Sequence, residues 1–291
     1  MKICEVIDAI LGYHSDFGPD YNGCDNYKSG DPSAECTGIV TALTPNIAVI
    51  RKAIELNANL IVTHEPTFYT SADGSGWFED FPNSVYEEKA ALLKEHGIVI
   101  WRDHDHLHFH NPDGIFTGVL KYTGWEKYAH AVRPPYGGFG HFVIDLPEPM
   151  TVEALARHLM TSIGGMNGCR YIGKADDLVK KVMIVGHLYP MSGPFTPKRK
   201  DGQPKEYSVQ IIGDMEEGID VILPGETIDW TVLSYVRDAV ELGHTKAMIS
   251  LGHFNWETLG MKYAKDWLSG LVPGIPVTFV EAGDMFHYFL A

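Results

Sequence analysis

Residues 98–110 read Ile-Val-Ile-Trp-Arg-Asp-His-Asp-His-Leu-His-Phe-His. The first four residues are apolar and predict a short buried strand. The run from Trp101 to His110 then holds four alternating histidines and two aspartates. Imidazole and carboxylate are the side-chain groups that bind divalent transition metals. The stretch therefore predicts a strand that ends at a metal site.

The chain upstream of this stretch alternates apolar strands with amphipathic helices. Strands are predicted at residues 38–43 and 60–63, and helices at 44–56 and 85–96. Because the strands are apolar on both faces and alternate with helices, the sequence predicts an α/β fold with a largely parallel sheet.

A second α/β segment is predicted after a turn-rich break at residues 133–140. A Pro-, Gly- and Lys-rich stretch at residues 190–206 predicts a mobile surface loop. Thr151 has the sequence context of a helix N-cap. The predicted elements of this segment and of the chain after it are strands at 141–146, 182–186, 221–223, 247–251 and 277–280 and helices at 151–162, 229–241 and 256–269.

The composition allows a large buried core in a chain of 291 residues. The formal net charge of -15 argues against a nucleic-acid surface, because phosphate binding needs clustered Lys and Arg. No apolar run approaches the ~20 residues that span a bilayer, and residues 1–5 lead into an acidic amphipathic helix rather than a signal peptide. The four cysteines show no CxxC spacing, so reduced thiols and a cytoplasmic location are expected.

Two further places put metal-binding side chains at the end of a predicted strand. His64 and Glu65 follow one strand, and His253 and Glu257 lie four residues apart where another strand passes into a helix. Ligands of α/β sheets bind in the crevice beyond the carboxyl ends of the strands, so three such ends together predict one site. Taken alone, each place also fits a structural role, as a buried histidine hydrogen-bonded at a strand end or as an ordinary pair on a surface helix.

The conformation of the histidine run decides which of its rings can meet. An extended chain would put all four histidines on one face, whereas a helical turn would bring His104 and His108 together. A solvated polar loop is the alternative in which none of them binds a metal. Asp103 and Asp105 are expected to orient the rings by hydrogen bonds. The other two histidines of the run have no assigned role, and His187, at a later strand end, is expected at most to line the pocket.

Three motifs, in this order, resemble those of the NIF-three-like family, whose members are often labelled GTP cyclohydrolase 1 type 2. They are residues 60–68, residues 104–108 with the Asp113-Gly114 pair after them, and residues 250–257. The resemblance implies two interleaved α/β domains with a dinuclear metal site in the cleft between them, and often a ring-shaped homohexamer. The predicted domains are residues 1–128 plus 245–291, and residues 129–244.

The resemblance also implies a set of metal ligands. Four positions match the family pattern directly, whereas Glu65 stands where the family usually has a second histidine and His108 where it usually has an aspartate. Both substitutes can still bind a metal. The predicted ligands are therefore His64, Glu65, His104, His108, His253 and Glu257.

Two divalent metal ions, with Zn, Fe or Mn as the candidates, are the expected cofactors. Two metals about 3.5–4 Å apart can bridge and deprotonate a water. The chain is therefore predicted to be a metal-dependent hydrolase that acts on a small molecule through a metal-bridging hydroxide, with Glu65 or Glu257 bridging the metals or accepting the proton of the water.

Two alternatives to the hydrolase remain. One is a non-catalytic metal-binding or regulatory protein, and the other is GTP cyclohydrolase-type ring opening, although the chain has no phosphate-loop motif. The expected partners are a small-molecule substrate and further copies of this chain, with no nucleic acid and no membrane.

Overall fold

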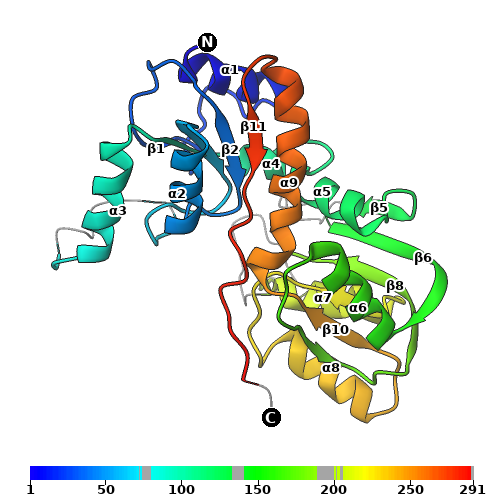
Figure 1. Ribbon diagram of the computed structural model, residues 1–291. Helices are drawn as coiled ribbons and strands as arrows, with labels where there is room; N and C mark the ends of the chain where they lie inside the picture. The colour runs from blue at the N-terminus through cyan, green and yellow to red at the C-terminus, as the bar shows by residue number, and fades with distance from the viewer. Residues whose placement is uncertain are drawn as a thin grey trace. The chain divides into compact units, whose positions relative to one another are not determined.

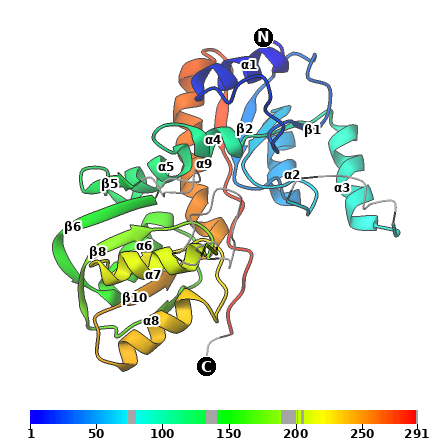
Figure 2. The same cartoon turned by 180° about the vertical axis from the view of Figure 1, so that it is seen from behind.

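The computed structural model describes residues 1–71, 73, 80–132, 141–188, 200, 202–203 and 206–289. The chain divides into two compact units, which Figures 1 and 2 show from opposite sides. Unit 1 comprises Met1–Gly118 and Glu257–Gly283, and unit 2 comprises Val119–Trp256 and Asp284–Ala291. Each unit combines one sheet with helices, so the predicted α/β class with two interleaved parts is confirmed. The boundaries at 128/129 and 244/245 stay a prediction for independently folding domains.

The sheet of unit 1 has the strand order β1-β4-β3-β2-β11. The strands β11, β2, β3 and β4 run parallel, while β1 pairs antiparallel with β4. The largely parallel sheet predicted from the apolar runs is therefore confirmed. The strands are β1 (Tyr27–Ser29), β2 (Ile39–Ala42), β3 (Leu60–Thr63), β4 (Val99–Arg102) and β11 (Val277–Phe279).

Helices cover both faces of this sheet. Val49 and Leu93, from α2 and α3, pack with Ile61 of β3 in one buried cluster. On the other face, the Thr41 hydroxyl donates a hydrogen bond to the Met261 carbonyl of α9 at 3.0 Å. The helices are α1 (Ile3–Tyr13), α2 (Ile47–Glu55), α3 (Ser84–Glu95), α4 (Asp105–Phe109), α5 (Gly114–Thr123) and α9 (His253–Leu271), the last two of which continue into unit 2.

Local side-chain signals set the ends of the helices. The Asn46 side chain accepts a hydrogen bond from the Val49 N–H before α2, and the Asn83 side chain accepts one from the Tyr86 N–H before α3. Gly97, which follows the end of α3, has a φ of 60°, which a residue without a side chain adopts at little cost. These caps fix where the chain leaves each helix for the next strand.

The sheet of unit 2 is mixed, with the strand order β5-β6-β8-β9-β10-β7. Its centre, β8-β9-β10, is parallel, and antiparallel strands flank the centre on both sides. The strands are β5 (Ala129–Val132), β6 (His141–Thr151), β7 (Arg170–Ile172), β8 (Leu178–Ile184), β9 (Val221–Leu223) and β10 (Ala247–Ser250), and the helices are α6 (Val152–Ile163), α7 (Tyr207–Glu216) and α8 (Val232–Glu241).

The core of unit 2 lies where α7 and α8 pack on the parallel centre of the sheet. Ile211 and Val236 from these helices share a buried cluster with Ile222 and Met248 from the strands. The Thr151 hydroxyl accepts a hydrogen bond from the Ala154 N–H and opens α6, as its sequence context predicts.

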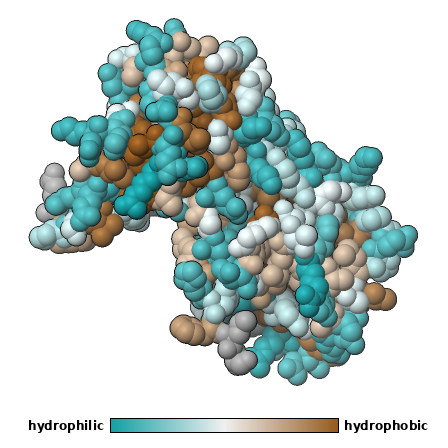
Figure 3. All heavy atoms as spheres, in the orientation of Figure 1, coloured by the Kyte–Doolittle hydropathy of each residue, from teal (hydrophilic) through white to brown (hydrophobic). Residues whose placement is uncertain are grey.

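Two of the segments predicted from the sequence cannot be compared with the structure. The predicted break at residues 133–140 and most of the predicted loop at 190–206 lie outside the described residues. Among the helices that are described, none combines the length and the apolar character needed to cross a bilayer. On the face drawn in Figure 3, hydrophilic side chains predominate, and hydrophobic ones gather in the part of unit 1 where Figure 1 places α2 and β2.

Candidate metal centre

Two neighbouring parallel strands of unit 1 end at the predicted ligands. β3 leads directly into His64, and β4 leads into Asp103 and α4. The Asp103 N–H donates to the Thr63 carbonyl at 2.8 Å, and the Arg102 Nε donates to the His64 carbonyl at 3.0 Å. The two chain segments are thus held together just beyond the sheet, at the carboxyl ends where α/β proteins bind ligands.

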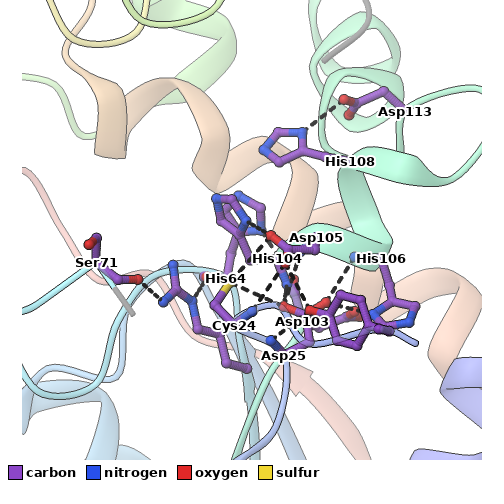
Figure 4. A network of polar contacts seen from close by, with 12 residues as sticks. Cys24, Asp25, His64, Ser71, Asp103, His104, Asp105, His106, His108 and Asp113 are labelled. Atoms are coloured by element: carbon purple, nitrogen blue, oxygen red, sulfur yellow. Dashed lines mark hydrogen bonds and ion pairs between the residues drawn. The ribbon is translucent and has the colours of Figure 1, made fainter. Parts of the chain in front are cut away.

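Three histidine rings meet at this edge of the sheet. The ring centroids of His64 and His104 are 4.4 Å apart, and those of His64 and His108 are 4.8 Å apart. Figure 4 shows the rings of His64 and His104 side by side, His108 close by, and His106 pointing away. The candidate ligand atoms of the three rings all lie within 4.8 Å of one another. That spacing is short enough for a single ion to contact several of them.

Each of these three rings is held through its Nδ1 atom. His64 Nδ1 lies 3.1 Å from the Asp103 carbonyl oxygen, and His104 Nδ1 lies 2.8 Å from Asp105 Oδ1. His108 Nδ1 lies 2.8 Å from Asp113 Oδ2. Since carbonyl and ionised carboxylate oxygens only accept, Nδ1 is the donor and the lone pair of the neutral ring is on Nε2. We call these three rings the anchored histidines, because this arrangement presents a metal with a ligand atom in a fixed orientation.

Two buried carboxylates complete the group in unit 1. Glu65 and Glu257 are 8% and 4% exposed, and each offers an oxygen within 4.8 Å of His64 and of the other. His64 Nε2 is 3.4 Å from Glu257 Oε2 and, among the described residues, has no hydrogen-bond partner. A buried lone pair that faces a carboxylate is unfavourable unless a cation lies between them. Imidazoles and carboxylates are also the donors that Zn, Fe and Mn accept, so the residues fit a divalent transition metal.

Close packing of two helices places Glu257 at this group. Glu257 lies on α9, and a Cβ added to Gly260, one turn further on, would come within 2.6 Å of Ile115 Cα on α5. A Cβ on Gly118 of α5 would come within 2.5 Å of the Leu259 carbonyl. Only glycine allows this approach of the helix backbones, so the two glycines fix α9 against α5.

The electrostatics favour neutral imidazole at one of the anchored histidines. Burial and the neighbouring His64 ring lower the pKa of His104 to about 4, so this ring is neutral at pH 7, as a metal ligand must be. Burial opposes the charged form of His108 too, but the Asp113 carboxylate, together with Glu257 and Glu65, outweighs burial and raises the pKa of His108. The hydrogen bond from His104 holds the pKa of Asp105 well below its usual range.

The sixth predicted ligand, His253, belongs to unit 2. Its Nδ1 lies 3.2 Å from Glu226 Oε1, and its ring centroid lies 4.5 Å from that of His187. His253 stands four residues before Glu257 on α9, as the sequence predicts. The structure thus brings five predicted ligands together in unit 1 and gives the sixth a carboxylate anchor in unit 2.

The helical turn of α4 separates the histidine run into two pairs. His106 Nδ1 lies 2.7 Å from Asp25 Oδ2, and the ring of His106 packs edge-on against Phe17. His110 is stacked on Tyr13, with the two rings 4.8 Å apart and nearly parallel. The helical alternative for the run is therefore confirmed, and the histidines without an assigned role pack in an aromatic cluster on the other side of the helix.

Sequence reasoning assigned no anchoring role to three residues that hold this arrangement. Asp25 accepts backbone N–H groups from the first turn of α4, Asp113 anchors His108, and Glu226 anchors His253. The expected orienting role of Asp105 is seen at His104, and Asp103 acts on His64 through its backbone carbonyl. No spacing in the sequence marks Asp25, since its partners are about eighty residues away.

Comparison with known proteins agrees with the fold and the motifs. A family model described as Duf34/NIF3 (NGG1p interacting factor 3) matches residues 2–186. A protein of Clostridium perfringens, named GTP cyclohydrolase 1 type 2 homolog, is 26% identical over 269 residues, which cover 88% of this chain and 87% of the relative. A relative of the same name from Clostridium acetobutylicum is 25% identical over 234 residues, which cover 78% of this chain and 75% of the relative.

Solved structures share the fold along the whole chain. The crystal structure of a Bacillus cereus protein related to NIF3 aligns with a TM-score of 0.71 and 16% identity and covers 99% of both chains. A Staphylococcus aureus protein aligns with a TM-score of 0.69 and 19% identity, again over 99% of both chains. The resemblance that three ordered motifs indicate is thereby confirmed, and the chain belongs to the Duf34/NIF3 family.

Proposed function

We propose that this chain is a metal-dependent hydrolase of a small molecule, with a divalent-metal centre at the anchored histidines. The observation that carries the proposal is the convergence of three histidine rings, each with Nδ1 held by an oxygen acceptor. Their ligand atoms lie within 4.8 Å of one another. Metal-binding histidines usually donate their second N–H to such an acceptor. His106 is also held through Nδ1, by Asp25, but its ring points away from this group, so the grouping of the ligand atoms separates the three rings from it.

The proposed ligands are more numerous than one tetrahedral ion needs. Four donors fill a tetrahedral site, and a catalytic site keeps one position open. We therefore propose two ions, with Zn, Fe or Mn as the candidates. The ligands proposed for them are His64, Glu65, His104, His108, His253 and Glu257.

In such a centre, residues of the chain would transfer the proton and hold the ligand rings in place. When bound, divalent ions would polarise a substrate oxygen and bring the pKa of a water toward about 7. Glu65 and Glu257 are buried carboxylates that can accept the proton of an attacking water and hold it for the leaving group. The anchors Asp105 and Asp113 keep the rings from rotating while the substrate is exchanged.

GTP is a specific substrate to test, because the relatives carry the name GTP cyclohydrolase 1 type 2 homolog. Ring opening of a purine is also a hydrolytic attack on an electrophilic carbon, so the same carboxylates could serve it. A protein that only binds or senses metal is the alternative from a different class, and turnover of any substrate would separate it from the hydrolase.

Activity measurements before and after metal removal test the proposal. Phosphate esters, amides and GTP are offered to the wild type, to His104→Ala and to His110→Ala, each with and without a chelator. We expect turnover of at least one substrate class that chelation abolishes, that added metal restores, and that His104→Ala lacks. His110→Ala is the matched control, since it removes a ring of the same run that lies outside the centre. Turnover that survives complete metal removal would contradict the proposal.

A further inference from the structure

Glu226 of unit 2 contacts two neighbouring histidines in opposite ways. Its backbone N–H donates to His187 Nδ1 at 2.9 Å, and its carboxylate lies 3.2 Å from His253 Nδ1. The two rings are themselves in contact, with centroids 4.5 Å apart and planes at 68°. Glu226 therefore contacts the Nδ1 atom of each histidine. It donates to Nδ1 of His187 and accepts from Nδ1 of His253.

The contact with the backbone settles the proton position on His187. An amide N–H can only donate, so His187 Nδ1 must carry a lone pair, and the proton of this ring is on Nε2. Such a ring cannot give an Nε2 lone pair to a metal unless it loses the hydrogen bond from Glu226. Although His187 lies beside a proposed ligand, its chemistry is that of a hydrogen-bond donor.

The contact with the carboxylate settles the opposite arrangement on His253. An ionised carboxylate only accepts, so the Nδ1 of His253 donates to Glu226 and the Nε2 of the neutral ring carries the lone pair. This is the arrangement of the anchored histidines in unit 1. His253 is thus prepared to bind a metal, while the ring beside it is prepared to donate.

The backbone around His187 holds the ring in this contact. The Leu188 N–H donates to the Glu226 carbonyl at 2.8 Å, so the segments after β8 and β9 stay paired. A Cβ added to Gly225 would come within 2.6 Å of His187 Nδ1, so the ring lies directly against the glycine backbone. A side chain at this position would push the ring away from the Glu226 N–H.

We propose that Glu226 fixes opposite tautomers on the two rings, so that His253 is a metal ligand and His187 is the Nε2–H donor that binds an oxyanion of the substrate. The ligand class is a phosphoryl or carboxylate group, because a fixed N–H donor beside a bound cation recognises an anionic oxygen. The assignment rests on the proposed function for the role of His253, but the tautomers themselves do not depend on a bound metal.

Nuclear magnetic resonance of the imidazole nitrogens tests the tautomers directly. In ¹⁵N-labelled, metal-free protein, long-range proton–nitrogen correlations distinguish a protonated nitrogen from one with a lone pair. The variants His187→Gln and His253→Gln identify the two rings. We expect a protonated Nε2 on His187 and a protonated Nδ1 on His253. A lone pair on Nε2 of His187 would overturn the assignment, whatever metal the protein binds.

Binding measurements test the proposed roles. Inorganic phosphate is titrated into metal-loaded wild type, His187→Gln and His187→Leu, and the metal content of each is measured together with its melting temperature. Glutamine keeps a donor near the Nε2 position, whereas leucine removes it. We expect unchanged metal content in both variants, phosphate affinity within about threefold of wild type for the glutamine variant, and a loss of about tenfold or more for the leucine variant.

Each contrary outcome has a distinct meaning. Loss of metal from a folded His187→Leu variant would overturn the proposal by making His187 a ligand. Equal phosphate affinity in all three proteins, or no phosphate binding by the metal-loaded wild type, would overturn the oxyanion site. Wild type that takes up no metal would instead contradict the proposed function, and the tautomer assignment would still be decided by the nitrogen spectra.

Discussion

A hydrogen bond at one nitrogen decides what the other nitrogen of each histidine can do. His64, His104 and His108 all donate through Nδ1, and their candidate ligand atoms lie within 4.8 Å of one another. His106 is held by Asp25 in the same way, but its ring packs against Phe17 outside this group. His187 accepts at the same atom and is therefore assigned a different chemistry. The number of histidines in the run says less about the metal centre than the few oxygen atoms that hold them.

Asp113→Asn tests this argument at one ring. The carboxylate of Asp113 serves two donors, His108 Nδ1 at 2.8 Å and the Phe116 N–H at 3.0 Å. Asparagine has one acceptor oxygen, so one of these donors must lose its partner or the ring must change its tautomer. We expect metal affinity to fall by about 10–100-fold, as for other losses of a carboxylate behind a metal-binding histidine. Metal titration followed by calorimetry measures the change.

The control is Asp145→Asn, which alters another Asp–His pair. Asp145 lies 3.2 Å from His130, and the two side chains are 42% and 66% exposed, unlike the buried pair at Asp113. This variant should bind metal as the wild type does. Equal metal affinity in the Asp113 and Asp145 variants would contradict the role assigned to Asp113.

Lys89 gives a prediction for the pH dependence of stability. Its Nζ donates to the Thr67 carbonyl at 2.6 Å, and burial lowers the pKa of this amine from 10.5 to about 8. Between these two values the unfolded chain binds more protons than the folded one, so the free energy of unfolding rises with pH. Relative to Lys89→Met, the wild type should gain about 1 kcal/mol between pH 8 and pH 9. Urea unfolding at both pH values measures the difference, and parallel behaviour of the two proteins would contradict it.

Among the elements, α4 is the one that places the ligands, and it depends on a distant residue. This helix spans only Asp105–Phe109, and the N–H groups of His104, Asp105 and His106 all donate to the Asp25 carboxylate. An isolated helix of this length is unstable in water. The buried carboxylate of Asp25 therefore stabilises both the turn and the separation of the histidines into pairs.

Asp25→Ala should destabilise the fold strongly for this reason. Three backbone N–H groups and the His106 ring would lose their acceptor, which should lower the free energy of unfolding by about 2–4 kcal/mol. Urea unfolding in the presence of a chelator measures this without a contribution from metal. Asp31→Ala is the matched control, because Asp31 accepts from Ser33 in an exposed turn, and it should cost less than about 1 kcal/mol. Similar losses in the two variants would contradict the role of Asp25.

The helices and strands that the sequence predicts correctly are those with a clear local signal, such as an apolar run or a helix cap. The strand Leu60–Thr63 and the helix after Thr151 were found where the apolar run and the cap predict them. The short strands β1, β5 and β7 were not predicted, because their pairing is decided by neighbouring strands rather than by their composition.

In the candidate site, too, contacts between residues close in the sequence could be predicted, and contacts between distant residues could not. Asp105 could be predicted as an anchor because it is adjacent to His104 in the sequence. The anchors of His64 and His253, in contrast, come from residues that only the fold brings near, at separations of 39 and 27 residues.

The whole molecule carries a formal net charge of -15, and part of this charge is buried near the centre. Glu65 and Glu257 lie in unit 1 with buried side chains, where a divalent cation would offset their mutual repulsion. Homo-oligomerisation, which the family resemblance implies, remains a prediction for the assembled protein.

Metal removal should therefore lower the stability of the folded chain. A ligand that binds only the folded state stabilises it by about 4 kcal/mol when its free concentration is about 1,000 times the dissociation constant. We expect the melting temperature of the wild type to fall on chelation and to recover when zinc is added back. His104→Ala should show little response to zinc, and an equal response of this variant and the wild type would argue that zinc acts elsewhere.

The metal content of the purified protein tests the central claim most directly. Wild type, His64→Ala, His104→Ala and His110→Ala are prepared without chelator at neutral pH and analysed by elemental mass spectrometry. The anchored histidines predict bound Zn, Fe or Mn in the wild type and in His110→Ala, and a loss of most of it from His64→Ala and His104→Ala. Full metal content in either of these two variants, or a wild type that holds no metal and takes up none when it is added, would contradict the proposed centre.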